Sequence, residues 1–152
     1  MNEFKPKELD LCKRTQELLR NFDGNYTVDF FFDSAWVFAI PKCRWLKKMP
    51  TQTIDRENWG IAPKDIRICK AYYSEGVKFK TVKDDYSVRS VARHLHNCAK
   101  RQQYKVRSIG DILERVRFEE WDKGRVTFEM EIPIRCFRDF LRKFLKTISP
   151  EP

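Results

Sequence analysis

Two runs of alternating apolar and charged residues, separated by one short turn, constrain the fold of this chain more than any other feature. Glu114–Trp121 and Arg125–Ile132 flank the turn Asp122-Lys123-Gly124. Alternation with a period of two is typical of a half-buried strand, and a three-residue connection ending in glycine suits a type I turn with a left-handed closing residue. The pattern therefore predicts an antiparallel hairpin with one face against a core.

The length of this turn also predicts which side chains meet across the hairpin. Arg115 is expected opposite Glu131, and Arg117 opposite Glu129, so that opposite charges face each other on the outer side. The inner side is expected to carry the apolar side chains of Val116, Phe118, Phe128 and Met130. Favourable pairs on both faces support this register.

Three segments have the apolar spacing of amphipathic helices, namely Glu8–Phe22, Val88–Gln103 and Ile134–Ile148. Ser87 is the expected N-cap of the second, and Pro133 stands at the start of the third, where proline is tolerated. Further strands are expected at Tyr26–Phe32, Trp36–Ile40, Asp65–Tyr73, Val77–Val82 and Tyr104–Ile109. These elements predict a mixed architecture of helices and antiparallel strands.

The predicted fold class is α+β, with an antiparallel sheet and three main helices. Residues 1–152 are expected to form a single domain, because the chain has 152 residues and is 41% hydrophobic, enough for a core without disulfides or metals. The element order of the C-terminal half is compatible with a ferredoxin-like β-α-β-β-α unit. Pro41–Pro63 is expected to be a long irregular segment, and such segments are usually functional or ordered by a partner.

The sequence also bears on location. No apolar run is long enough to cross a bilayer, and Met1–Asp10 is acidic and lacks the apolar region of a signal peptide. The five cysteines are scattered and odd in number, which favours reduced thiols. We therefore expect an intracellular protein, cytoplasmic or in the nucleoid or nucleus, that is not secreted and has no membrane partner.

Positive charge is segregated along the chain. Lys and Arg exceed Asp and Glu by nine, and three tracts concentrate the excess so strongly that the remainder is net acidic. The first tract contains Arg89, Arg93, Lys100, Arg101, Lys105 and Arg107, and the second contains Lys42, Arg44, Lys47 and Lys48, both without an acid. The third is the last helix, with Arg135, Arg138, Arg142, Lys143 and Lys146 against Asp139. This distribution indicates a polyanionic partner.

Helical geometry arranges the first tract. At about 100° per residue, Arg89, Arg93, His96 and Lys100 share a narrow stripe opposite the apolar face. A cationic stripe of this kind is suited to a phosphate backbone, although it is also compatible with a simple solvated face. In the last helix, the outward positions are Arg135, Arg138, Arg142 and Lys146.

Trp45 lies among the cations of the second tract. Two roles are compatible with this position. The indole either stacks on an exposed base while its neighbours hold phosphates, or pins the segment to the core.

The sequence contains no complete set of metal-binding or catalytic residues. The run His94-Leu95-His96-Asn97-Cys98 resembles a metal cluster, but His96 points away from the other two and no second ligand pair has suitable spacing. We therefore predict no metal, no cofactor and no catalytic residue. A small metal-independent nuclease, with His96 beside Arg93 and Lys100, remains a lesser alternative.

The leading hypothesis is a non-catalytic nucleic-acid-binding module, with a place in a larger nucleoprotein assembly left open. The main alternative is a protein-interaction factor, an inhibitor or adaptor, that docks on an acidic protein surface. In that case Trp45, Met49 and Trp59 of the proline-punctuated segment are the expected apolar anchors. DNA or RNA, single strand or duplex, and the oligomeric state all stay open.

Overall fold

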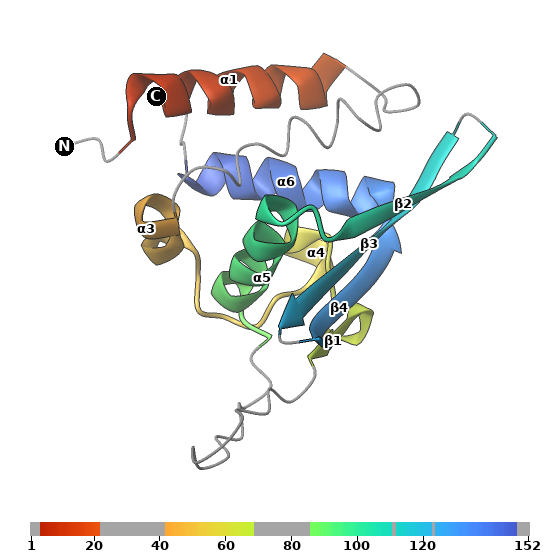
Figure 1. The fold of residues 1–152 in the computed structure, drawn as a ribbon. Coiled ribbons are helices and arrows are strands. Elements are labelled where there is room, and N and C mark those ends of the chain that lie inside the picture. The colour runs from red at the N-terminus through yellow and green to blue at the C-terminus, as the bar shows by residue number, and fades with distance from the viewer. Residues whose placement is uncertain (1–3, 22–41, 69–85, 111, 123, 149–152) are drawn as a thin grey trace, which may run out of the picture.

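A computed structural model describes residues 4–21, 42–68, 86–110, 112–122 and 124–148 (Figure 1). The main elements are α1 (Pro6–Asn21), β1 (Ile66–Ile68), α5 (Val88–Lys100), β2 (Tyr104–Ile109), β3 (Ile112–Asp122), β4 (Arg125–Pro133) and α6 (Ile134–Ile148). This α+β architecture confirms the predicted fold class and the three main helices. The strands predicted at Tyr26–Phe32, Trp36–Ile40 and Val77–Val82 lie outside the described residues.

The four described strands form one sheet in the order β1-β4-β3-β2, and every neighbouring pair is antiparallel. Helices α5 and α6 pack against β3, and α6 also contacts β4, so both cover the same face (Figure 1). Val116, Phe118, Phe128 and Met130 are buried on that face, as predicted. The ferredoxin-like order is not confirmed by this topology.

The hairpin between β3 and β4 forms as predicted, but its register differs by two residues. Gly124 closes the turn with φ +78°. Asp122 pairs with Arg125 at the turn, one residue from the predicted register, and the register shifts by one more between Glu120 and Trp121, so that Arg117 lies opposite Glu131. An even shift leaves each side chain on its predicted face. The predicted ion pairs also form, but diagonally, with Arg117 Nη2 2.9 Å from a Glu129 oxygen and Arg115 Nε 3.3 Å from a Glu131 oxygen.

The segment predicted as irregular folds instead into short helical turns. These are α3 (Lys42–Trp45), the 3₁₀ turn η2 (Leu46–Lys48), α4 (Arg56–Trp59) and the 3₁₀ turn η3 (Pro63–Asp65). Turns of three or four residues are too short to produce a recognisable apolar period. The segment covers the core, because Trp45 packs edge-on against Phe144 with ring centroids 5.1 Å apart.

The core lies between the sheet and α6, whose buried residues are Cys136, Phe137, Phe140, Leu141, Phe144, Leu145 and Ile148. Helix α1 packs on the far side of α6 and contributes the buried Cys12 and Thr15 (Figure 1). None of the helices in the described ranges has the length and apolar character needed to cross a membrane. The apolar faces of α5 and α6 therefore determine which cations face outward.

Candidate nucleic-acid interface

Helix α5 is oriented by its cap and by its apolar face. The Ser87 hydroxyl accepts a hydrogen bond from the Ser90 backbone N–H at 3.1 Å, which satisfies one free donor of the first turn and confirms the predicted N-cap. Val91 and Leu95 are completely buried against the core. The opposite side of the helix is therefore the side that contains Arg93 and Lys100, and both are exposed.

The predicted four-residue stripe is exposed only in part. His96 is 4% exposed, and its ring lies 5.6 Å from the Trp45 indole, so its predicted surface position was wrong. Arg89 is half-buried and donates to the backbone oxygens of Met49 (3.1 Å) and Lys47 (3.2 Å). His96 and Arg89 are covered because α3 and η2 pack along this side of α5. The sequence pattern of α5 alone predicts that this side is exposed to solvent.

Trp45 is completely buried at 0% exposure. Of its two predicted roles, the structure therefore shows the structural one, in which the indole pins the segment to the core. The prediction that Trp45 stacks on an exposed base is wrong for this structure. No ring face of a fully buried side chain is accessible to a ligand.

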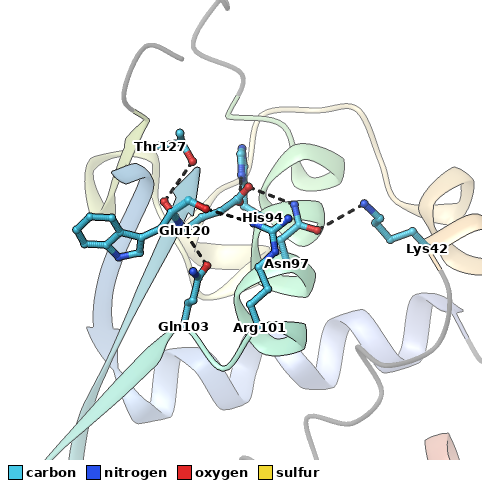
Figure 2. Close-up of polar contacts among 8 residues, drawn as sticks. Lys42, His94, Asn97, Arg101, Gln103, Glu120 and Thr127 are labelled. Atoms are coloured by element: carbon cyan, nitrogen blue, oxygen red, sulfur yellow. Dashed lines mark hydrogen bonds and ion pairs between the residues drawn. The ribbon is translucent and has the colours of Figure 1, made fainter. Parts of the chain in front are cut away.

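One lysine of the second basic tract reaches α5. Lys42 Nζ lies 3.5 Å from Asn97 Oδ1, and Asn97 lies between Arg93 and Lys100 on the helix (Figure 2). Arg101 follows at the C-terminal end of the same exposed side. We call Lys42, Arg93, Lys100 and Arg101 the α5 basic ridge. It unites cations from two tracts that are far apart in the sequence.

A buried histidine–carboxylate pair lies beneath this ridge, and the sequence patterns did not predict it. His94 Nδ1 lies 2.6 Å from Glu120 Oε2, and Asn97 donates to the other oxygen of that carboxylate at 3.2 Å (Figure 2). The His94 ring also stacks on Phe128, with centroids 4.5 Å apart. A signal existed in the sequence: Glu119 and Glu120 are adjacent in an alternating strand, so one of the two acids must face inward.

The charge of Glu120 is stabilised by its neighbours. Burial alone would raise the pKa of this carboxyl group, but the hydrogen bond and charge of His94, the hydrogen bond from Asn97 and the charge of Arg93 together lower it below the ordinary value of 4.5. An ionised carboxylate thus holds α5 to β3. It also offsets part of the positive charge beneath the ridge.

This pair predicts a pH-dependent stability. Because the pKa of Glu120 is lower in the folded state, its contribution is present above pH 4.5 and is lost as the pH falls through the folded value. Replacement of Glu120 by Gln is expected to lower the free energy of unfolding at neutral pH by about 1–3 kcal/mol and to flatten the acid decline. Urea titrations over a pH series measure both effects. The control Glu17→Gln removes an exposed acid of α1 and is expected to change neither; an unchanged acid decline in Glu120→Gln would contradict the interpretation.

A second positive surface lies on strand β2, at the edge of the described sheet and on the face opposite the helices. Lys105 and Arg107 are exposed there and lie directly opposite Arg117 and Arg115 of β3. Like charges in directly opposed positions destabilise a strand pair. Arg115 and Arg117 have glutamate partners on β4, whereas Lys105 and Arg107 form no ion pair with any residue in the described ranges. A polyanion would therefore relieve repulsion along this strand.

The other predicted cations do not belong to the ridge. Arg44 forms an ion pair with Glu8 of α1, and Lys48 Nζ lies over the Phe4 ring, 4.6 Å from its centroid. Lys47 is exposed on η2. On α6, as predicted, the apolar side faces the core; Arg135, Arg142 and Lys146 are exposed and Arg138 is half-buried. These α6 cations form a separate basic surface.

The histidines and the cysteine of the run His94–Cys98, which the sequence suggested as possible metal ligands, have structural roles in the fold. Cys98 is buried on the core side of α5, and burial raises the pKa of its thiol, which makes the reactive thiolate rarer. Within the described ranges, no three side chains of the metal-binding types lie close enough together to hold an ion. The arrangement is thus one of cations and hydrogen-bond donors around a buried ion pair.

Comparisons of this chain with protein-family models, with curated proteins and with solved structures gave no match.

Proposed function

We propose that this chain is a non-catalytic nucleic-acid-binding module that contacts phosphates through the α5 basic ridge and strand β2. The observation that carries the proposal is that Arg93 and Lys100 are both exposed and have no ion-pair partner among the described residues. The other sides of their helix are packed. Exposed cations that form no ion pair favour an external anion.

The geometry of the ridge suits a repeating anion. Arg93 and Lys100 are seven positions apart, which corresponds to about 10 Å along a helix axis. Arg101 and Lys42 widen the ridge on either side, and Lys105 and Arg107 add two exposed cations on the other face of the sheet, at β2. Each cation that meets a phosphate releases a counterion, so several such cations together produce strongly salt-dependent binding.

The double variant Arg93→Ala/Lys100→Ala tests this proposal. We expect the slope of log affinity against log salt to fall by about two, roughly 0.9 for each phosphate that the variant no longer neutralises, and the affinity for a generic oligonucleotide to fall at least about tenfold at low salt. Fluorescence anisotropy with a labelled oligonucleotide over a salt series measures both.

The matched control is Lys7→Ala/Lys13→Ala, which removes the same charge from exposed positions of α1. It is expected to keep the wild-type slope, because those lysines belong to α1, which packs on α6 and not on α5 or the described sheet. An equal loss in both double variants would indicate a nonspecific effect of net charge. Wild-type binding that does not change with salt would contradict the proposal itself.

A second candidate is a factor that binds an acidic protein. It is favoured by the position of β2 at the edge of the sheet, where Val106 and Ile109 are 39% and 66% exposed. An acidic strand added to this edge would gain backbone hydrogen bonds and neutralise Lys105 and Arg107. The anchors predicted for this role are not available, since Trp45, Met49 and Trp59 are buried. The nuclease alternative weakens for a similar reason: the histidine proposed for its site, His96, is buried against Trp45.

A further inference from the structure

Trp121 differs from the other described tryptophans in its exposure. Its side chain is part of an open surface at 42% exposure, whereas Trp45 and Trp59 are buried at 0% and 5%. It stands near the end of β3, next to the point where α5 leads into β2. Exposure of a large apolar ring to water is unfavourable, and exposed apolar surface often marks an interaction site. The contacts around Trp121 therefore indicate whether it has such a role.

Hydrogen bonds hold Trp121 in place from three sides. Its backbone N–H donates to Gln103 Oε1 at 3.3 Å, and its backbone oxygen accepts from Arg101 Nη1 at 3.2 Å. The indole Nε1–H donates to Glu119 Oε2 at 3.2 Å. The polar atom of the ring is therefore satisfied within the protein, while a flat apolar surface remains exposed. A ring held in this way loses little conformational freedom when a ligand binds.

The charges around Trp121 favour an anionic ligand with an aromatic part. Arg101 of the α5 basic ridge donates to the backbone oxygen of Trp121, and Lys105 stands on the neighbouring strand. The nearby acid Glu119 has a cationic partner: a hydrogen bond from Arg117, which also pairs with Glu129, is the largest of the influences that lower the pKa of Glu119, with the Trp121 indole and the charges of Arg117 and Lys105 adding to it. Glu119 thus anchors the ring as a carboxylate, and Arg117 and Lys105 together offset its charge.

We propose that Trp121 is a stacking platform for an unpaired base and that the ligand of the ridge is single-stranded nucleic acid. This inference rests on the proposed function and narrows its ligand class. A base can stack on an indole only when one of its faces is free, and in a duplex both faces are covered by neighbouring pairs. The cations hold the backbone on either side of the stacked base.

Three probes of equal length separate stacking from charge: an oligothymidylate, an abasic oligomer with the same phosphates but no bases, and a duplex. The wild type is expected to bind the oligothymidylate at least about tenfold more tightly than the abasic oligomer. Trp121→Leu removes the ring but keeps an apolar side chain. It is expected to abolish this difference, a loss of about 10- to 100-fold for one stacked base, and to leave the abasic affinity unchanged. Trp121→Phe is expected to retain most of the preference.

The outcomes distinguish this inference from the proposed function. Equal affinity for the oligothymidylate and the abasic oligomer, tighter binding of the duplex, or an unchanged preference in Trp121→Leu would each overturn stacking. The salt slope that depends on Arg93 and Lys100 would survive those outcomes. If no probe binds in a salt-dependent way, the proposed function fails as well. Thermal denaturation of each variant verifies that the protein is folded, which is expected because Trp121 lies outside the core.

Discussion

Replacement of Trp45 by alanine is expected to lower the free energy of unfolding by about 3–5 kcal/mol. Trp45 is completely buried, and its ring packs against Phe144 of α6 and His96 of α5. Its removal leaves a large cavity where three helices meet, and surrounding side chains collapse only partly into such a space. Guanidinium denaturation followed by far-UV circular dichroism measures the loss.

The same substitution at Trp121 is the natural control. Trp121 is 42% exposed and stands at the end of a strand, so Trp121→Ala is expected to cost less than about 1 kcal/mol. The two tryptophans are expected to show opposite behaviour in binding, since only Trp121 is accessible to a ligand. A nearly neutral Trp45→Ala would contradict the buried position of this indole and reopen its predicted role in stacking.

Replacement of Gly60 by alanine is expected to destabilise the protein by about 2–6 kcal/mol, because two costs add. Gly60 ends α4 with φ +74°, a left-handed conformation that side chains with a Cβ rarely adopt. A Cβ at this position would also lie 2.5 Å from the backbone oxygen of Cys136 and 3.0 Å from Asp139 Cβ, both on α6. Helix α4 would have to move away from α6. The shift of the thermal midpoint measures the total.

Gly124 separates these two costs. It has a similar φ of +78°, but a Cβ there would meet no heavy atom within 4 Å. Gly124→Ala is therefore expected to carry only the conformational cost, about 1–2 kcal/mol. Equal effects at the two glycines would show that the close approach of α4 to α6 does not contribute.

The elements with the longest periodic patterns were predictable from the sequence. The β3–β4 hairpin, α6 and the N-cap of α5 all depend on residues that are neighbours in the chain or one turn apart. The predicted register of the hairpin was wrong by two residues. One comes from the turn, where Asp122 pairs with Arg125, and one comes from the irregularity between Glu120 and Trp121, which has no local signal. The four short turns between residues 42 and 65 were missed because none contains a full apolar period.

The candidate site was predictable only where one helix forms it. Arg93 and Lys100 follow from helical spacing, and both are exposed as expected. The burial of His96 depends on α3, which no pattern within α5 reveals. The pairing of His94 with Glu120 spans 26 positions and that of Lys42 with Asn97 spans 55, so both require the tertiary fold. Trp121 was assigned to a strand, but its exposure beside Arg101 emerges only from the packed structure.

Strand β2 has a further consequence for the behaviour of the protein in concentrated solution. An edge strand with exposed apolar residues such as Val106 and Ile109 is a template for aggregation through backbone pairing. Lys105 and Arg107 oppose this, because two copies aligned along β2 would bring their cations together. The same two side chains therefore act as gatekeepers against misassembly, whatever ligand the strand binds. Removing their charge sacrifices this protection together with any affinity for anions.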